Sequence, residues 1–199
     1  MAVGLLLVAL RGWELVWFGL AGFLLGFLYT APPVRLAHRG LGELAVGLGF
    51  GPVMVLGSYW VQAQRWSNEA VLASLPVGLL IAAVVFINEI PDRMWDAKAG
   101  KRTLITRLTP AASIKGYGIL MAAAYLAIGG GAAAGVLPLP TLLGLLTVPM
   151  AWRAFQGLRR HYAHPYRLIP ANANTIFAHL LTGLLMFVGY VVTQAMARL

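Results

Sequence analysis

The chain of 199 residues has no cysteine and few charged side chains. Only 11% of its residues are charged and six are acidic, whereas 60% are hydrophobic and the mean hydropathy is +0.79. The absence of cysteine excludes a disulfide framework, thiolate catalysis and cysteine metal sites. The scarcity of polar residues excludes disorder, and a soluble fold of this length could not hide so much apolar surface from water. The composition therefore indicates an integral membrane protein.

Apolar runs separated by polar segments predict an all-α fold, a polytopic transmembrane helix bundle that forms one membrane-embedded domain over residues 1–199. Crossing ~30 Å of hydrocarbon takes about 20 helical residues, so the length allows about seven spans and no sizeable soluble domain. The runs cover residues 2–10, 13–28, 44–62, 70–87, 112–137, 139–152 and 173–196. The first run is too short to cross a bilayer, and we interpret it as the end of a span whose beginning is absent.

The excess of 15 basic over six acidic residues predicts the orientation of the chain. If the N-terminus is cytoplasmic, the loops 29–43, 88–111 and 153–172 lie inside. Together with Lys115 at a loop edge they hold all Lys and Arg except Arg11, Arg65 and Arg198. The positive-inside rule predicts this asymmetry. We therefore interpret the charge as orienting a multi-pass protein in a bacterial or archaeal cell membrane, and we expect no nucleic-acid partner.

Pairs of glycines spaced four residues apart predict close helix packing within the bilayer. The pairs are Gly22/Gly26, Gly47/Gly51 and Gly131/Gly135. Small residues at this spacing let two helix backbones approach each other. The glycines of 47–51 are not interpreted as a phosphate loop, because they lie inside an apolar run with no strand before them.

The segment 85–103 carries the clearest chemistry. Pro91 is expected to begin a new short helix, on which Asp92 and Asp96 share a face at i and i+4. Two such carboxylates repel each other unless a cation lies near them, and Mg²⁺ commonly takes one or two carboxylates plus substrate phosphates. Lys98, Lys101 and Arg102 lie just beyond and suit phosphate oxygens. The alternative is a solvated loop with local salt bridges.

A second polar loop, 29–43, is predicted to lie on the same membrane face. Its Arg35, His38 and Arg39 could meet a diphosphate held over the aspartates, or they could serve only to orient the chain. At the start of the last span, Asn172 and Asn174 could line a cavity or cap the helix.

Three stretches resemble the UbiA family of intramembrane prenyltransferases. They are Y-T-A-P-P-V-R-L-A-H-R-G-L-G-E at 29–43, F-G-P-V-M-V-L-G-S-Y at 50–59 and N-E-I-P-D-R-M-W-D-A-K-A-G-K-R-T-L at 88–104. The likeness is closest to the menaquinone-pathway branch, which prenylates 1,4-dihydroxy-2-naphthoate. It implies a bundle of nine transmembrane helices in which Mg²⁺ and two Asp-rich motifs bind the diphosphate of a polyprenyl donor. It also implies an aromatic acceptor, such as a dihydroxynaphthoate, whose ring carbon attacks the allylic cation.

The resemblance also implies roles for individual residues. Asp92 and Asp96 would be the catalytic metal ligands, and Asn88 and Glu89 would neighbour the cavity. The residues implied in substrate binding are Tyr29, Arg35, His38, Arg39, Asn88, Lys101 and Arg102. Of these, Arg35 and His38 stand where relatives often have lysine.

The family's first Asp-rich motif, N-D-x-x-D-x-x-x-D, has no match in residues 1–28, where Glu14 is the only acid. By this resemblance the seven runs would be helices three to nine, without the two N-terminal helices. One hypothesis is therefore a prenyltransferase represented by a truncated chain. The alternative is a truncated, non-catalytic relative that binds prenyl diphosphate or lipid without turnover. A transporter is disfavoured, because the acids of 88–96 cluster at one membrane face instead of near mid-span.

Overall fold

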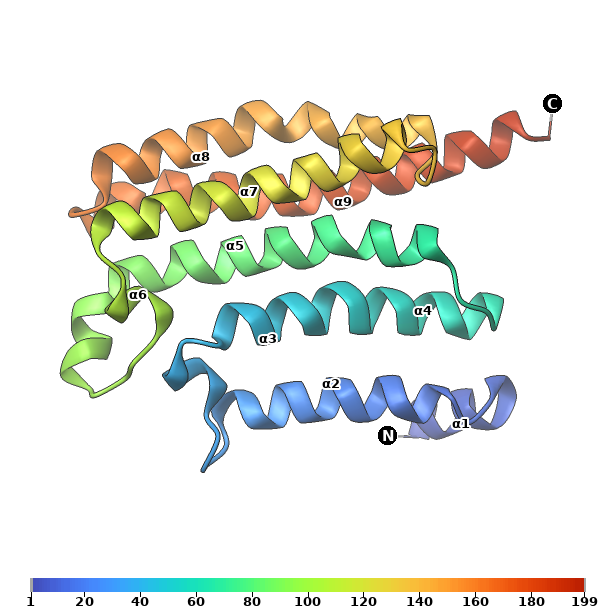
Figure 1. Cartoon of the computed structure of the whole chain (residues 1–199), viewed down its shortest axis with the longest axis horizontal. Helices are drawn as coiled ribbons and strands as arrows, with labels where there is room; N and C mark the ends of the chain where they lie inside the picture. Colours follow the sequence, from blue (N-terminus) through green and yellow to red (C-terminus); the bar gives the residue numbers. More distant parts are fainter. Residues whose placement is uncertain (1, 199) are drawn as a thin grey trace.

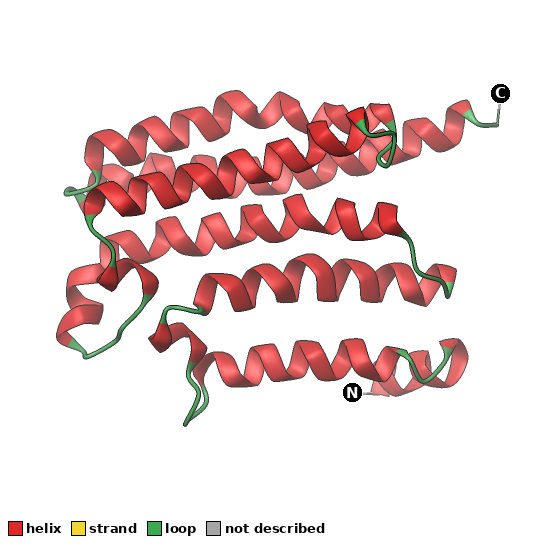
Figure 2. Cartoon of the chain, in the orientation of Figure 1, coloured by secondary structure: helices red, strands yellow, loops and turns green. Residues whose placement is uncertain are grey.

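The computed structural model describes residues 2–198, which form helices joined by short connections (Figure 2). No strand is present in this part of the chain, so the predicted all-α class is confirmed. The helices in chain order are α1 Ala2–Arg11, α2 Leu15–Thr30, η1 Leu36–Arg39, α3 Gly42–Leu48, η2 Gly49–Val53, α4 Met54–Ala63, α5 Asn68–Lys98, α6 Leu104–Arg107, α7 Pro110–Ala133, η3 Leu139–Thr147, α8 Val148–His161, η4 Pro165–Leu168 and α9 Ile169–Met196.

Each of the seven predicted apolar runs coincides with one helix or with two or three consecutive helical segments. Four stretches are long and apolar enough to cross a membrane, namely Gly42–Ala63, Asn68–Lys98, Pro110–Ala133 and Pro165–Met196. The first of them joins α3, η2 and α4 into one continuous rod. α1 and α2 are apolar but shorter than a full span. These lengths agree with a membrane protein.

The helices run roughly parallel or antiparallel to one another, with α5 in the middle (Figure 1). α5 packs against α3, α7 and α9, and α9 packs against α8 and η3. α2 lies on the other side of the α3–α4 rod, and α1 packs against α2. The connections before α3, after α5 and before α9 all lie at one end of the bundle. We name this end, comprising residues 31–41, 99–109 and 162–168, the basic end.

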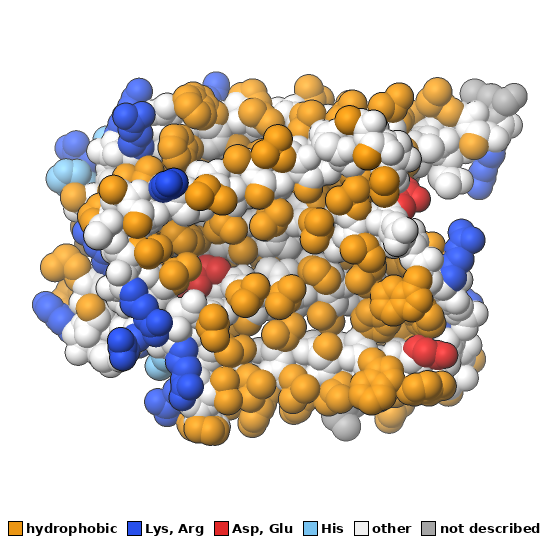
Figure 3. Space-filling view, in the orientation of Figure 1, with side chains coloured by type: hydrophobic (Ala, Val, Ile, Leu, Met, Phe, Trp, Pro, Cys, Tyr) orange, Lys and Arg blue, Asp and Glu red, His pale blue; other side chains and the backbone are white. Residues whose placement is uncertain are grey.

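Lys and Arg side chains gather at the basic end, and fewer lie at the opposite end (Figure 3). The distribution agrees with the predicted segregation of charge between the two ends. One boundary was wrong: the segment 153–161 is not a loop, because α8 continues to His161. Arg153 therefore lies near the middle of a helix with a strongly polar face, and Arg159 and Arg160 lie in its last turn. Such a face lets a helix continue from the apolar region toward water.

Glycines join α5 to the α3–η2 segment at van der Waals contact. A Cβ at Gly78 would lie 2.6 Å from the Gly47 carbonyl oxygen, and one at Gly51 would lie 2.7 Å from the Gly78 Cα. No side chain fits at either place, so the packing role predicted for Gly47/Gly51 is confirmed. The same prediction was wrong for Gly26 and Gly135, where a Cβ would meet no atom within 4 Å.

Pro91 does not begin a new helix, as the sequence led us to expect. α5 runs without interruption from Asn68 to Lys98 and contains Pro91 in its interior. A proline there cannot donate to the carbonyl of Ile87, but Ile87 and Ile90 are both fully buried. Tertiary packing keeps the helix continuous although this hydrogen bond is missing, as is common in membrane helices. Asp92 and Asp96 consequently lie on the last turns of a long helix anchored in the core.

Candidate functional site

The two polar loops singled out in the sequence meet at the basic end. The Arg102 amide donates a hydrogen bond of 3.0 Å to the carbonyl of His38. Beside it, a Cβ at Gly40 would lie 3.2 Å from the Leu104 amide nitrogen, so the two backbones are in contact. Residues more than sixty positions apart thus form one surface beside the end of α5.

A glycine turn at the end of α5 fixes the position of Lys101. Gly100 has a φ of +74°, its amide donates to the Ala97 carbonyl at 3.1 Å, and the Lys101 amide donates to the Asp96 carbonyl at 2.9 Å. This is a Schellman motif, in which glycine adopts the left-handed conformation without a steric penalty. The turn brings the Lys101 side chain back over the helix that it follows.

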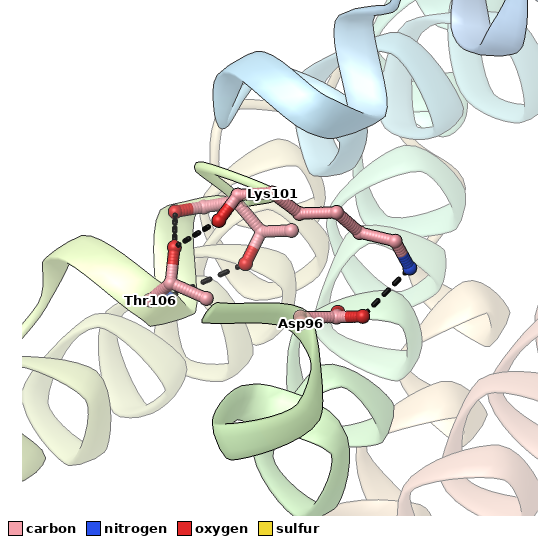
Figure 4. Close-up of polar contacts among 4 residues, drawn as sticks. Asp96, Lys101 and Thr106 are labelled. Carbon is pink, nitrogen blue, oxygen red and sulfur yellow. Dashed lines mark hydrogen bonds and ion pairs between the residues drawn. The ribbon is translucent and has the colours of Figure 1, made fainter. Parts of the chain in front are cut away.

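Lys101 Nζ forms an ion pair with Asp96 Oδ1 at 2.6 Å (Figure 4). The hydrogen bond to Asp96 is the main cause that raises the pKa of Lys101 above its usual value. The next turn is held by Thr106, whose hydroxyl donates to the Thr103 carbonyl at 2.9 Å. Asp92, one helical turn before Asp96, is exposed and has no ion pair among the described residues. The pair therefore presents one free carboxylate and one that is shared with a cation.

Two glutamates lie deeper, between α3 and α5. Glu43, in the first turn of α3, is only 5% exposed, and Glu89 on α5 lies within electrostatic range of it. Glu43 Oε1 and Glu89 Oε2 are buried without a hydrogen-bond partner. The Tyr29 hydroxyl approaches this place, since a Cβ at Gly42 would lie 3.6 Å from it. The sequence analysis did not assign Glu43, although a lone acid at the start of an apolar run was a usable signal.

Asn88 points to the other side of α5, toward α9. Asn172 Nδ2 donates to Asn88 Oδ1 at 2.7 Å, and Asn172 Oδ1 is buried without a partner. Asn174 donates to the Pro170 carbonyl at 2.8 Å. Neither asparagine caps α9, which has no side-chain cap. Asn88 and Asn172 therefore form a polar pair one helical turn below Asp92.

The other basic residues predicted for the site form no ion pair with the aspartates among the described residues. Arg39 Nη2 donates to the Pro33 carbonyl at 2.9 Å and so stabilises its own loop. Arg35 adopts a φ of +46° and is exposed, as is Arg102, while His38 is half-buried. No ion pair links any of them to Asp92 or Asp96 among residues 2–198. The charges of the three arginines are thus available to an anion at the basic end.

Arg93 is a further residue that the sequence analysis did not single out for a role. Its Nη1 donates to the Tyr162 carbonyl at 3.1 Å, and its guanidinium lies 4.6 Å from the centroid of the Tyr162 ring. The Tyr162 hydroxyl donates in turn to Ser113 Oγ at 3.1 Å. Arg93 therefore ties the aspartate-bearing end of α5 to α7 and to the connection after α8.

An apolar groove of about 440 Å³ begins beside Glu43. It runs from Gly40 and Leu104 at the basic end toward Gly78 and Ile119, between α3, α5 and α7. Glu43 is the only charged residue of its lining. The groove suits an apolar chain whose polar end lies at the basic end.

The carboxylates of this site can hold a magnesium ion only if a bound substrate supplies further ligands. Across the described residues, no three His, Cys, Asp or Glu side chains are grouped so as to hold a metal. Asp92 and Asp96 supply two carboxylates, which is the number that Mg²⁺ usually takes when substrate phosphates complete its shell. The site can therefore hold Mg²⁺ together with a diphosphate, but it is not an all-protein metal cage.

Comparison with known proteins places these features in a family. A 1,4-dihydroxy-2-naphthoate octaprenyltransferase of Bacillus subtilis (strain 168) is 28% identical over 191 residues, which are 96% of this chain and 61% of the relative. A 2-carboxy-1,4-naphthoquinone phytyltransferase of Synechocystis is 29% identical over 86% of this chain and 56% of the relative. A 1,4-dihydroxy-2-naphthoate octaprenyltransferase of Mycobacterium tuberculosis is 35% identical over 79% of this chain and 53% of the relative.

The chain spans between about half and three fifths of the length of these relatives. No solved structure matches it. The pattern of the UbiA prenyltransferase family matches residues 1–176, which is most of the sequence. The chain therefore belongs to the UbiA prenyltransferase family.

Proposed function

We propose that the protein transfers a polyprenyl group from its diphosphate to an aromatic acceptor of the dihydroxynaphthoate class, in quinone biosynthesis. The observation that carries this proposal is the meeting of the Asp92–Asp96 helix end with the loop of Tyr29 and His38. A relative whose name specifies naphthoate prenyl transfer matches 96% of this chain. The apolar groove beside Glu43 supplies the matching site for an isoprenoid chain.

Residues at the end of α5 and in the loops of the basic end would bind the diphosphate in different ways. Asp92 and Asp96 would hold Mg²⁺, which when bound neutralises the charge that develops on the leaving diphosphate. Lys101 and Arg102 bind phosphate oxygens directly, and Arg35 adds charge from the facing loop. Since Lys101 is already held over Asp96 at 2.6 Å, its ammonium is positioned before the substrate arrives. Such preorganised charge contributes strongly to catalysis.

The reaction needs one bond broken and one formed. The carbon–oxygen bond to diphosphate breaks, a ring carbon of the acceptor attacks the allylic cation, and the ring then releases the group that this carbon carried. The buried oxygens Glu43 Oε1 and Glu89 Oε2 have no partner, so they can accept a hydrogen bond from an acceptor hydroxyl. Asn88 pairs with Asn172 on the α9 side of α5, away from these glutamates, and is given no contact with the same ring.

The same proposal includes the position of the protein in the cell. The long apolar helices and the basic end support a multi-pass protein of the cell membrane, with the basic end in the cytoplasm. The polyprenyl donor would then bind where the membrane meets the cytoplasm, with its diphosphate on the water side and its isoprenoid chain in the bilayer.

The test is prenyl transfer by the chain reconstituted in lipid vesicles. Labelled polyprenyl diphosphate, Mg²⁺ and 1,4-dihydroxy-2-naphthoate should give a labelled lipid-soluble product. Asp92→Asn and Asp96→Asn should each lower the rate about 10²–10³-fold, as the loss of a main electrostatic contact does. Glu14→Gln, which removes a carboxylate at the opposite end, should leave the rate unchanged. Binding of the diphosphate without product would contradict catalysis by this chain, and full activity in both aspartate variants would remove them from the site.

A further inference from the structure

A second groove lies between α7 and α8, away from the site described above. Its volume is about 620 Å³. It extends along α7 from Gly118 to Gly130, which is about 18 Å at 1.5 Å per helical residue, or roughly one lipid chain. Its walls are apolar or aromatic and include Tyr125, Trp152 and Phe155. Trp152 and Phe155 stack with ring centroids 5.6 Å apart, so one wall is a flat aromatic surface.

Two cations stand at the basic end of this groove. α7 and α8 touch there, since a Cβ at Gly118 would lie 3.0 Å from the Phe155 ring. Lys115 precedes Gly118 by three residues and Arg159 follows Phe155 by four, so each shares the groove-facing side of its helix. Both side chains are exposed. A positive charge from each helix therefore lies above the mouth of an apolar channel.

The sequence after Asp96 holds no acidic side chain that could neutralise these cations. The last acidic residue of the sequence is Asp96, and ten basic residues follow it. The single ion pair among the described residues is Lys101–Asp96, so neither Lys115 nor Arg159 has an acidic partner there. Both charges are therefore free to attract an anion from outside the protein.

We propose that the α7–α8 groove binds one anionic phospholipid, with its phosphate between Lys115 and Arg159 and an acyl chain along Gly129 and Trp152. Because Lys115 and Arg159 complement a net negative charge, the groove should prefer an anionic lipid to a zwitterionic one. Basic residues at the membrane surface each attract anionic lipid by roughly a fivefold preference. The site is independent of the proposed catalysis, because none of its residues belongs to the diphosphate site.

The experiment is native mass spectrometry of the protein released from vesicles of equal phosphatidylglycerol and phosphatidylcholine. The wild type should retain phosphatidylglycerol severalfold over phosphatidylcholine. Lys115→Gln with Arg159→Gln should lower this preference by about fivefold for each charge removed. The matched control, Arg153→Gln with Arg160→Gln, removes the same charge from the opposite side of α8 and should preserve the preference. Equal losses in the two double variants would overturn the proposal, since they would show only a general attraction of the basic end.

A second variant tests the groove itself. A Cβ at Gly129 would meet no atom within 4 Å, and the same is true of Gly183 on α9. Gly129→Leu should therefore fill the channel without harming the fold and should reduce retained lipid, whereas Gly183→Leu should not. Unchanged retention in Gly129→Leu would contradict the groove as the binding place. Displacement of phosphatidylglycerol by farnesyl diphosphate, lost in the Lys115/Arg159 double variant, would instead identify a prenyl-donor site and overturn the phospholipid assignment.

Discussion

The helices from α5 onward and the helices before it are packed in different ways. α5 has ten buried residues and α7, α8 and α9 add seven, three and six, whereas α1 and α4 have none. The later helices therefore enclose a core of their own, which includes Phe86, Tyr117 and Leu158. The earlier helices present most of their apolar side chains outward, such as Phe23 and Phe27 on α2.

Hydroxyl pairs hold the later helices together but have no counterpart among the hydrogen bonds described for α1 to α4. Tyr117 pairs with Thr175 at 2.7 Å, and Thr147 pairs with both Tyr125 at 2.9 Å and Thr182 at 2.6 Å. In an apolar environment such bonds fix the register of one helix against another. The later helices thus form a scaffold for the aspartates, while the loop 29–43 between α2 and α3 belongs to the earlier helices. The candidate site lies where the two regions meet.

The largest expected effect comes from separating the two regions at their glycine contact. Gly78→Leu would place its Cβ 2.6 Å from the Gly47 carbonyl oxygen. A backbone atom cannot move aside as the end of a flexible side chain can. Overpacking of this kind costs about 3 kcal/mol or more. Thermal unfolding in detergent should show a marked loss of stability. Gly26→Leu, where a Cβ meets no atom within 4 Å, should unfold like the wild type; equal losses in both would show that the contact is not tight.

The next effect tests the scaffold alone. Thr147→Val keeps the shape of the side chain but removes both hydroxyl pairs and leaves Tyr125 and Thr182 without this partner. Such a loss costs about 1–2 kcal/mol. The exposed Ser58→Ala on α4 should cost less than about 0.5 kcal/mol. Similar values for the two, by chemical or thermal unfolding, would argue that hydroxyl bonding does not distinguish the regions.

A smaller effect is expected at the turn that places Lys101. Gly100→Ala forces a residue with a Cβ into a φ of +74°, which costs about 1 kcal/mol. Space is not the obstacle, because a Cβ there meets no atom within 4 Å. Substrate binding should be affected more than stability. The KM for prenyl diphosphate should therefore rise while the unfolding temperature changes little. Gly183→Ala, within a helix, is the control that should leave KM unaltered.

The smallest change in stability is expected for Lys101→Gln. The ion pair is partly exposed, with side chains 38% and 15% accessible, and exposed pairs contribute less than about 1 kcal/mol. Diphosphate binding should weaken nonetheless. Because the hydrogen bond to Asp96 raises the pKa of Lys101, the stabilisation is present at low pH and is lost only as pH rises through that raised value. Binding by the wild type should therefore not change through Lys101 between about pH 6 and 9. A Lys101-dependent loss in that range would contradict this ion pair.

The sequence was sufficient to predict the all-α class and the positions of the seven helical runs, because hydrophobic length is dictated by the bilayer. It also grouped the residues of 29–43 with those of 88–104, since charge asymmetry put both loops at one end. It could not predict the continuity of α5 through Pro91, because that depends on the burial of Ile87 and Ile90 by other helices.

The sequence also could not predict which side of α5 each residue of 88–93 faces. Neighbouring positions diverge around α5: Asn88 meets Asn172 on α9, Glu89 approaches Glu43 on α3, and Arg93 binds the carbonyl of Tyr162. Local spacing predicts only that Asp92 and Asp96 share a face. The partners of the other residues depend on which helices pack around α5, and this is a property of the whole bundle.

The most direct test of the account is whether the two loops touch in the membrane-embedded protein. The chain has no cysteine, so His38→Cys combined with Arg102→Cys introduces the only thiols, at positions whose backbones share a hydrogen bond of 3.0 Å. Mild oxidation in vesicles should join them in a disulfide and protect both from alkylation. The control pair Arg65→Cys with Arg102→Cys, from opposite ends of α5, should stay reduced. Free thiols in both pairs would contradict the convergence on which the site depends.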